Sequence, residues 1–462
     1  MNEIISTTVG GLRGPGLTEA DRADLNAATT AANAAAAAVP PVLTLARTTA
    51  RTGGGRQLYR LKKSLSNPLC QFLGIVLIGD SITWGMTVTG GADVAPYPRR
   101  GSLADARNNA TSPTWVNLLH QYLGRDYYDD TSVSASTWPA ATAAAVAAGR
   151  PASDAGVAIF RYGKTVNLFP QGGDFKTTND NALPSRGAWT VSYNPSGYIG
   201  GYVTFTVDSS VDNGRLSFGP FTGYKFKMVF AALSDGARYE LYENGVLKGT
   251  FSTQTGDTGL PVSFGNIREH DLGGFVRDAE ISIKVVPGDN ARRILRVEAI
   301  VIDRELRVTN QGVIGTDSIH WYNDLIRDAV QDGDSVAFIQ LGTNDRYLAP
   351  TDYQVPVGAA TLRRYLEAIC VFLEGRGISP IMACANAAVT ETGYFTMSEV
   401  RGSIASLADA RGYDMIDHFQ PTRALLAAGD TSWSPDGLHP GDTGHSEMFQ
   451  QKRDAIEKSM GR

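Results

Sequence analysis

The spacing of apolar residues predicts a regular alternation of strands and helices in the C-terminal third of this 462-residue chain. Apolar runs that end in turn residues alternate with segments of helical spacing, which indicates a parallel, doubly wound α/β sheet flanked by helices. We expect the strands at 296–302, 305–309, 335–341, 379–384 and 413–416. We expect the helices at 317–331, 356–376, 396–411 and 442–459. A buried strand at 75–78 and a helix at 113–124 begin the same pattern nearer the N-terminus.

The middle of the chain, 136–300, contains short runs in which apolar and polar residues alternate. Such runs, separated by turn sequences, are typical of an antiparallel β-sandwich. The clearest hairpin is 239–249, with Glu243-Asn244-Gly245 at its turn. We therefore expect a jelly-roll-like antiparallel β-sandwich inserted in a surface loop of the α/β domain, because inserts with neighbouring ends are tolerated there.

The N-terminal segment differs from both regions. Residues 1–16 are rich in glycine, and an alanine-dominated helix runs from a capping box at Thr18 to about Ala38. This helix is either a solvated linker or a stalk that packs against copies of itself, and 42–73 is interpreted as a connector. The expected domains are 1–60 (N-terminal attachment segment), 61–135 (first part of the α/β domain), 136–300 (insert) and 301–462 (second part).

Composition argues against several classes of partner. A net charge of −5 without a basic block is untypical of a protein that binds nucleic acid. No apolar run is long enough to span a membrane, and the first residues lack the basic and apolar regions of a signal peptide. The three cysteines, Cys70, Cys370 and Cys384, are too few for a disulfide framework. We expect synthesis in a reducing cytoplasm, without a membrane partner.

Four short motifs carry the candidate chemistry. Gly79-Asp80-Ser81 follows the apolar run 75–78, which places Ser81 at the carboxyl end of a strand, where open α/β sheets bind ligands. Three further motifs follow in order: Asn310-Gln311-Gly312-Val313-Ile314-Gly315, Gly342-Thr343-Asn344-Asp345 and Asp436-Gly437-Leu438-His439-Pro440. Together they resemble the four sequence blocks of the GDSL, or SGNH, hydrolase family. The resemblance covers about 75–135 and 300–462 and implies a flavodoxin-like hydrolase domain.

The residues of the first and last motifs suit ester cleavage by a serine nucleophile. A serine hydroxyl needs a neighbouring base that removes its proton, and His439 lies in an Asp-x-x-His-Pro setting. Asp436 can hold one ring nitrogen and leave the other facing Ser81. His418 and His445 are the rival bases, and for His445 we expect a structural role.

The family resemblance also implies an oxyanion hole and no metal or other cofactor. Its donors would be the backbone N–H of Ser81, the backbone N–H of Gly312 and the side-chain amide of Asn344. We expect Asp80 and Asp345 to fix their loops. Trp84 would either line the acyl pocket or pack in the core. The acidic turn 208–213 lacks an EF-hand pattern, and a solvated turn is favoured over a calcium site.

Two features favour a sugar ester. No long apolar stretch suggests a lipid lid, and the insert is rich in aromatic residues that either stack on sugar rings or fill the core. The candidates are Trp189, Tyr193, Tyr198 and Tyr224. The N-terminal segment resembles the attachment end of a bacteriophage tail fibre or tailspike.

We therefore expect a virion-borne, homotrimeric serine esterase that removes O-acetyl groups from a bacterial capsule or O-antigen polysaccharide. It would contact other tail proteins through its N-terminus and leave the cell by lysis. The alternatives are a catalytically silent glycan-binding tail protein or adhesin, and a lipase or thioesterase of the same family.

Overall fold

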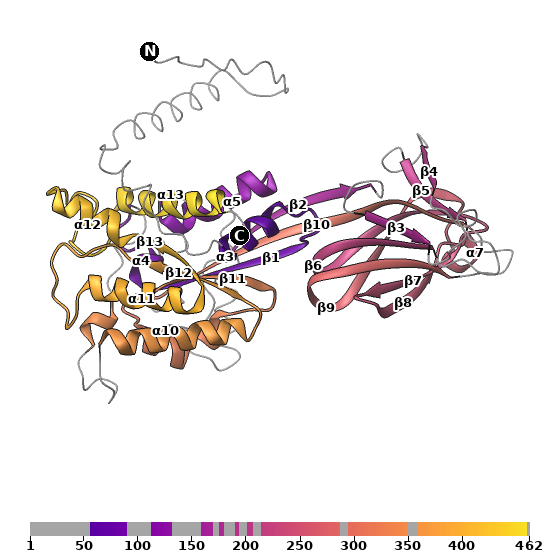
Figure 1. The fold of residues 1–462 in the computed structure, drawn as a ribbon. Coiled ribbons are helices and arrows are strands. Elements are labelled where there is room, and N and C mark those ends of the chain that lie inside the picture. Colours follow the sequence, from indigo (N-terminus) through magenta and orange to yellow (C-terminus); the bar gives the residue numbers. More distant parts are fainter. Residues whose placement is uncertain are drawn as a thin grey trace, which may run out of the picture. The chain divides into compact units, whose positions relative to one another are not determined.

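The computed structural model describes residues 56–89, 112–131, 159–169, 175–179, 190–193, 201–206, 214–286, 294–348 and 358–459. Within this part of the chain, the strands join in one mixed sheet with flanking helices (Figure 1). Its parallel half has the order β13-β12-β11-β1-β10. These strands are β1 (Phe72–Gly79), β10 (Ile294–Gly312), β11 (Asp334–Gln340), β12 (Ser379–Cys384) and β13 (Asp414–Asp417). Every residue of β1 is buried, as is typical of a strand covered on both faces.

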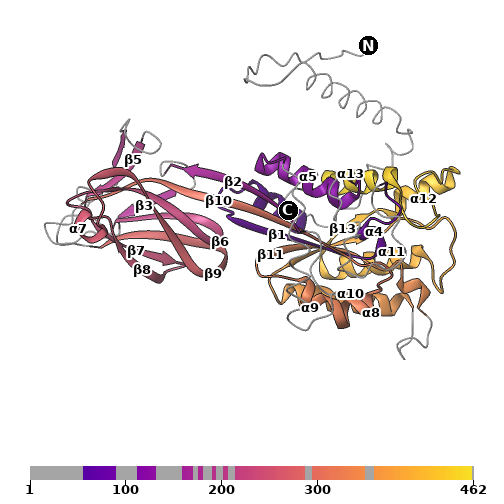
Figure 2. The same cartoon turned by 180° about the vertical axis from the view of Figure 1, so that it is seen from behind.

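Helices cover both faces of the parallel strands (Figures 1 and 2). On one face lie α3 (Arg56–Ser66), α5 (Trp115–Tyr128) and α13 (Asp442–Lys458). On the other lie α8 (Ser318–His320), η4 (Trp321–Leu325), α9 (Ile326–Ala329), α10 (Ala359–Glu374) and α11 (Met397–Arg411). The short helix α12 (Phe419–Ala427) follows β13. The doubly wound α/β arrangement predicted for this part of the chain is confirmed.

Most predicted elements of the parallel half are confirmed within a few residues, and three differ. The two strands expected at 296–302 and 305–309 are one strand, β10. The helix expected at 317–331 is present but contains a π-helical turn at Trp321–Leu325. The connector expected at 42–73 is wrong for 56–66, which forms α3 because Leu58, Leu61 and Leu65 recur at helical spacing and are buried.

The antiparallel half is built on long strands. Its elements are β2 (Ile159–Leu168), β3 (Phe175–Asn179), β4 (Thr190–Tyr193), β5 (Gly201–Thr206), β6 (Gly214–Ala232), β7 (Arg238–Glu243), β8 (Val246–Ser252), α7 (Thr255–Thr258) and β9 (Ser263–Val286). Strand β10 joins the two halves, since 305–312 pair parallel with β1 and 297–301 pair antiparallel with β6. A second core forms here around residues such as Phe218, Tyr239 and Ile300.

The predicted hairpin within the antiparallel half is confirmed. Strands β7 and β8 pair across a two-residue turn in which Asn244 and Gly245 have φ of 47° and 81°. Positive φ at both turn residues is what a tight hairpin requires. The separate inserted β-sandwich and the domain boundaries stay predictions, and the alanine-rich helix at 18–38 lies outside the described residues.

Candidate active site

The sharp turn after β1 presents Ser81. Asp80 is the N-cap of the one-turn helix α4 (Ser81–Trp84), and its Oδ1 accepts a hydrogen bond from the Ile82 N–H at 2.9 Å. Gly85, with φ of 100°, ends the helix and donates its N–H to the Ser81 carbonyl at 3.1 Å. Ser81 is thereby fixed at the carboxyl edge of the parallel sheet, where its prediction placed it.

The structure brings Ser81, His439 and Asp436 together. Ser81 Oγ lies 2.8 Å from His439 Nε2, and His439 Nδ1 lies 2.7 Å from Asp436 Oδ2. The other carboxylate oxygen, Oδ1, accepts the backbone N–H of His439 at 2.7 Å and that of Leu438 at 2.9 Å. One carboxylate therefore holds both the backbone and the ring of His439, with the far ring nitrogen directed at Ser81.

The electrostatics of Asp436 favour its ionised form. Partial burial tends to raise the pKa of this carboxyl, but the hydrogen bonds from the His439 ring and from the two backbone N–H groups outweigh burial and lower the pKa below its ordinary value. The Asp436 side chain stays 40% exposed, whereas that of His439 is only 11% exposed. An ionised Asp436 can stabilise the imidazolium that His439 becomes when it takes a proton.

Two residues that the sequence analysis missed hold the His439 loop. Ser434 Oγ donates to the His439 carbonyl at 3.0 Å. Asn386 Nδ2, in the loop after β12, donates to the Leu438 carbonyl at 2.7 Å. Neither residue lies in a recognisable motif, since each acts on a backbone carbonyl and only the folded chain brings them to it.

The rival histidines are held elsewhere. His418 is buried, with Nδ1 at 2.6 Å from Gln451 Oε1 and Nε2 at 2.6 Å from Lys452 Nζ. His445 accepts the Trp115 N–H at 3.1 Å through Nδ1, and burial lowers its pKa to about 3. The structural role predicted for His445 is therefore confirmed, and only His439 is hydrogen-bonded to Ser81 among these three histidines.

Gly312 does not offer its N–H to a substrate, and this corrects its predicted role. The Gly312 N–H donates to Asn310 Oδ1 at 2.9 Å, and the residue is buried. A Cβ placed on Gly312 would lie 2.4 Å from the Trp84 nitrogen, so this glycine is required for close packing against α4. The second glycine of the same motif, Gly315, is exposed and has φ of 73°.

Asn344 lies in the loop after β11, at the same edge of the sheet as Ser81. Its Nδ2 donates to the Thr316 carbonyl at 2.9 Å, one residue beyond Gly315. A carboxamide nitrogen carries two hydrogens, so this bond orients the group and leaves a second hydrogen as a donor.

The two acidic loop residues behave as predicted, each fixing backbone near the site. Asp345 accepts the Ser318 N–H at 3.2 Å and also accepts the Ser318 hydroxyl. Burial raises the pKa of Asp80 to about 6 and that of Asp345 to about 7. Both carboxyls therefore carry their charge at a cost to the folded state near neutral pH.

Trp321 connects the nucleophile strand to the loop that follows β10. Its ring is buried, and its Nε1–H donates to the Gly79 carbonyl at 3.1 Å. The same nitrogen lies 3.1 Å from Thr316 Oγ1. The apolar spacing over 317–331 predicts Trp321 only as a helix residue. Trp321 begins a π-helical turn, and its Nε1–H reaches the carbonyl of Gly79, two residues before Ser81 in the chain.

Neither Trp84 nor Tyr224, the two predicted aromatic contacts whose side chains the structure describes, offers an exposed ring at Ser81. Trp84 is buried in α4, which agrees with the packing alternative. Tyr224 packs against Phe72 and Phe275, with ring centroids 5.5 and 5.0 Å apart, at the amino end of β1 and thus far from Ser81. Tyr193 lies in β4, while Trp189 and Tyr198 lie outside the described residues.

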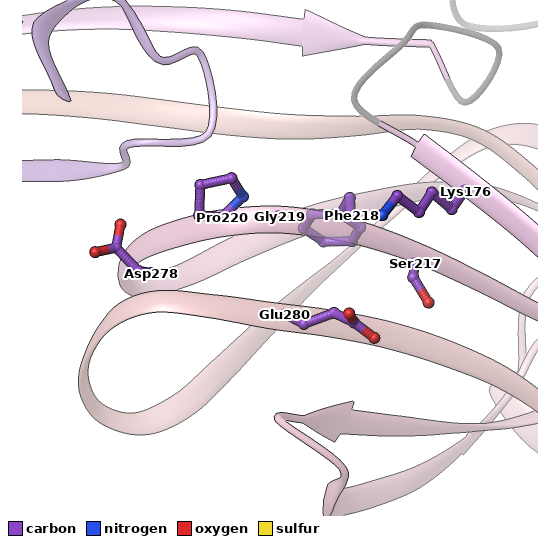
Figure 3. A pocket seen from close by; sticks show the side chains of 7 residues that line it. All are labelled: Lys176, Ser217, Phe218, Gly219, Pro220, Asp278 and Glu280. Carbon is purple, nitrogen blue, oxygen red and sulfur yellow. The ribbon is translucent and has the colours of Figure 1, made fainter. Parts of the chain in front are cut away.

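A pocket of about 230 Å³ in the antiparallel half is separate from this site (Figure 3). Lys176, Asp278 and Glu280 are its charged residues. Across the described ranges, no three His, Cys, Asp or Glu side chains are grouped to hold a metal ion. In the same ranges, no helix is both long and apolar enough to cross a membrane. Cys70, Cys370 and Cys384 are buried free thiols.

The C-terminal part of the chain matches a known family. Residues 288–451 match the family model described as GDSL-like Lipase/Acylhydrolase. The match supports the GDSL/SGNH lipase–acylhydrolase family, and with it a hydrolase acting on esters. It includes Asn344, Asp436 and His439, whereas Ser81 precedes the matched range.

Three solved structures show distant similarity. A peptidoglycan O-acetylesterase is 14% identical, with 88% of this chain and 95% of that chain covered and a TM-score of 0.33. The acetylxylan esterase Axe2 from Geobacillus stearothermophilus is 18% identical, with 33% and 72% covered and a TM-score of 0.26. A Bacillus subtilis protein is 15% identical, with 63% and 90% covered and a TM-score of 0.26. No curated protein matches the chain in sequence.

Proposed function

We propose that the protein is a serine esterase that removes O-acetyl groups from a bacterial surface polysaccharide. The observation that carries this proposal is the continuous chain from Ser81 Oγ through the two ring nitrogens of His439 to Asp436, with distances of 2.8 and 2.7 Å. Such a chain activates a serine hydroxyl, and the family match supports ester hydrolysis.

The reaction would proceed through an acetyl-enzyme. As Ser81 Oγ attacks the acetyl carbonyl carbon, His439 Nε2 takes the hydroxyl proton and Asp436 stabilises the imidazolium. The tetrahedral intermediate collapses, the bond to the sugar oxygen breaks, and His439 returns the proton to that oxygen. Water then attacks acetyl-Ser81 with His439 again as base, which releases acetate and restores the serine hydroxyl.

The oxyanion of each intermediate would be held by the N–H of Ser81, the amide of Asn344 and the N–H of Gly315. Gly315 takes the place first given to Gly312 because the Gly312 N–H is bonded to Asn310, whereas Gly315 is exposed beside the carbonyl that orients Asn344. Donors fixed in advance stabilise the transition state because they need no reorganisation during the reaction.

Exposed aromatic residues beside the site favour a sugar ester. Tyr347 is 41% exposed and follows Asn344 by three residues, and Tyr394, 67% exposed, is tied to the same loop by its N–H bond to the Arg346 carbonyl at 2.7 Å. Exposed tyrosine rings present an apolar face together with a polar tip, which suits the faces and hydroxyls of sugars.

The attachment of residues 1–60 to a phage tail, the homotrimer and the release by lysis remain part of this proposal. They rest on the glycine-rich and alanine-rich pattern of that segment alone.

The test is acetate release, followed by NMR, from O-acetylated capsule and O-antigen polysaccharides, together with hydrolysis of 4-nitrophenyl acetate. The wild-type protein should release acetate, and Ser81→Ala, which removes one oxygen atom, should not. Glycan binding without release of acetate would support the silent tail protein instead. Preference for long acyl chains over acetyl would support a lipase or thioesterase.

A further inference from the structure

A second pocket, of about 540 Å³, lies at the edge of the parallel sheet opposite Ser81. It is lined by Ser335 and Val336 at the start of β11 and by Ser379 at the start of β12. Because β11 has seven residues, this edge is about 20 Å from the edge that carries Asn344. The pocket is therefore separate from the candidate active site, and we call it the basic pocket.

One wall of the basic pocket is a cationic face of α3. Arg56, Arg60 and Lys63 recur at intervals of four and three residues, so they share one face of the helix, and all three are exposed. The opposite face is apolar and buried. Within the described ranges, the one ion pair of a side chain of this helix joins Lys62 to Glu457, and Lys62 does not line the pocket. The three lining cations thus have no carboxylate partner in the described part of the chain.

The other wall carries a fixed guanidinium. Arg277 donates from Nη1 to Ser335 Oγ at 2.7 Å and from Nη2 to the Asp334 carbonyl at 2.6 Å. Its guanidinium carbon lies 4.8 Å from the ring centroid of Phe275. A guanidinium held in this way loses little conformational freedom when it binds an anion.

The charge of the basic pocket opposes that of the whole chain. Four cations line it, and Asp278 is the one carboxylate among its lining residues, whereas the chain as a whole carries −5. Unpaired like charges that face one another repel and are costly to gather, so a lining of this kind indicates an anionic ligand. Tyr59, 41% exposed, adds an aromatic ring between the cations.

We propose that the basic pocket binds an acidic polysaccharide, and that this is the chain from which acetyl groups are removed. From Arg56 to Lys63 the cations extend over about 10 Å of helix, which suits carboxylates spaced along an oligosaccharide, with Tyr59 against a sugar ring. The net negative charge of the chain disfavours nucleic acid as the ligand. This inference rests on the proposed function, because the polysaccharide bound by the basic pocket is the substrate of Ser81.

The experiment measures binding separately from turnover. Oligomers of polygalacturonate are titrated calorimetrically into the full-length Ser81→Ala protein at low salt, with neutral xylan oligomers and single-stranded DNA as comparison ligands. The test variant combines Arg56→Gln, Arg60→Gln and Lys63→Gln. The matched control combines Arg161→Gln, Lys225→Gln and Lys248→Gln, which removes the same charge from cations that already pair with Glu305, Glu269 and Glu243.

Polygalacturonate should bind more tightly than xylan or DNA, and added salt should weaken its binding. The test variant should bind about tenfold more weakly, because each exposed ion pair contributes a small share, while the control should stay within about twofold. No binding by Ser81→Ala, equal losses in both variants, or tighter binding of DNA would each overturn the proposal. Hydrolysis of 4-nitrophenyl acetate by the test variant on the wild-type background reports on the esterase separately, and should be unchanged.

Discussion

The two edges of the parallel sheet differ in how their polar residues are held. At the carboxyl edge, Ser81 and His439 are largely buried, and hydrogen bonds join Ser81 to His439 and His439 to Asp436. At the amino edge, the three cations of α3 that line the basic pocket, Arg56, Arg60 and Lys63, are exposed and have no carboxylate partner among the described residues. Groups that are fixed and shielded from water suit catalysis, because the rate depends on how accurately the reacting groups are placed. Exposed charges suit the binding of a long, flexible polysaccharide, because long-range electrostatic attraction does not need its charged groups to be in fixed positions.

The largest difference between the edges is expected from His439→Ala. This change removes the base from Ser81 and should lower kcat for 4-nitrophenyl acetate by about 10³-fold or more. His320→Gln, at a histidine whose side chain is 42% exposed and lies 3.7 Å from the Asp324 carboxylate, is the control and should keep full activity. A rate for His439→Ala close to that of the control would remove the catalytic distinction between the edges.

Asp80→Asn tests the energetic cost of burial at the carboxyl edge. The pKa of Asp80 is raised by burial from 3.8 to about 6, so the folded state holds this proton more tightly than the unfolded state. Stability is therefore lost as pH rises from about 4 to about 6, and the cost above that range is at most about 3 kcal/mol. Asparagine caps a helix as well as aspartate, so the variant should be the more stable protein at about pH 7.5.

Urea denaturation at about pH 4 and about pH 7.5 checks this prediction, and the advantage of Asp80→Asn should shrink towards zero at the lower pH. The matched change at the amino edge is Arg60→Gln, on an exposed helix face, which should alter stability by less than about 0.5 kcal/mol at both pH values. Lower stability of Asp80→Asn at the higher pH would show that the buried charge is favourable.

Asp436→Asn should have a smaller effect on the rate than His439→Ala. The change keeps the size of the side chain but removes the charge that stabilises the imidazolium, and we expect kcat to fall by about 10²-fold. The effect is limited because the Asp436 side chain is 40% exposed, so water screens its charge. Asp430→Asn is the control, because this half-buried carboxylate a few residues earlier accepts hydrogen bonds from Ser432 and, among the described residues, none from His439. Equal rates for the two variants would show that Asp436 only positions the loop.

Trp321→Phe should have the smallest effect of the four. The change keeps a smaller aromatic ring in the core but removes the Nε1–H that donates to the Gly79 carbonyl, so the turn before Ser81 gains freedom. We expect kcat to fall about tenfold with little change in KM, together with a loss of stability about 1 kcal/mol greater than that of Trp433→Phe, which loses the same volume but no hydrogen bond. Trp433→Phe is the matched control, because Trp433 is also buried and its Nε1 has no hydrogen-bond partner among the described residues. Similar kinetics for both variants would reduce Trp321 to a packing residue.

The sequence was most informative where a short motif directly follows a predicted strand. The motifs around Ser81, Asn344 and His439 predicted which loops meet, because parallel strands bring their carboxyl ends to one edge. The sequence did not predict which backbone N–H groups are already occupied, or whether a short amphipathic segment forms a helix. The motif with Gly312 contains two glycines, and only the folded loop shows that the Asn310 side chain occupies the N–H of the first. Helix α3 carried helical spacing, but without a sheet to pack against its short apolar stripe resembled a connector.

The most direct measurement of the central claim is covalent labelling of the nucleophile. The protein is treated with a serine-directed organophosphonate ester, and the adduct is located by mass spectrometry of its peptides. The structure predicts one phosphonylated residue, Ser81, with labelling that is lost in Ser81→Ala and greatly slowed in His439→Ala. An adduct on another serine, or equal labelling rates in the wild type and His439→Ala, would contradict the assignment of Ser81 and His439 as nucleophile and base.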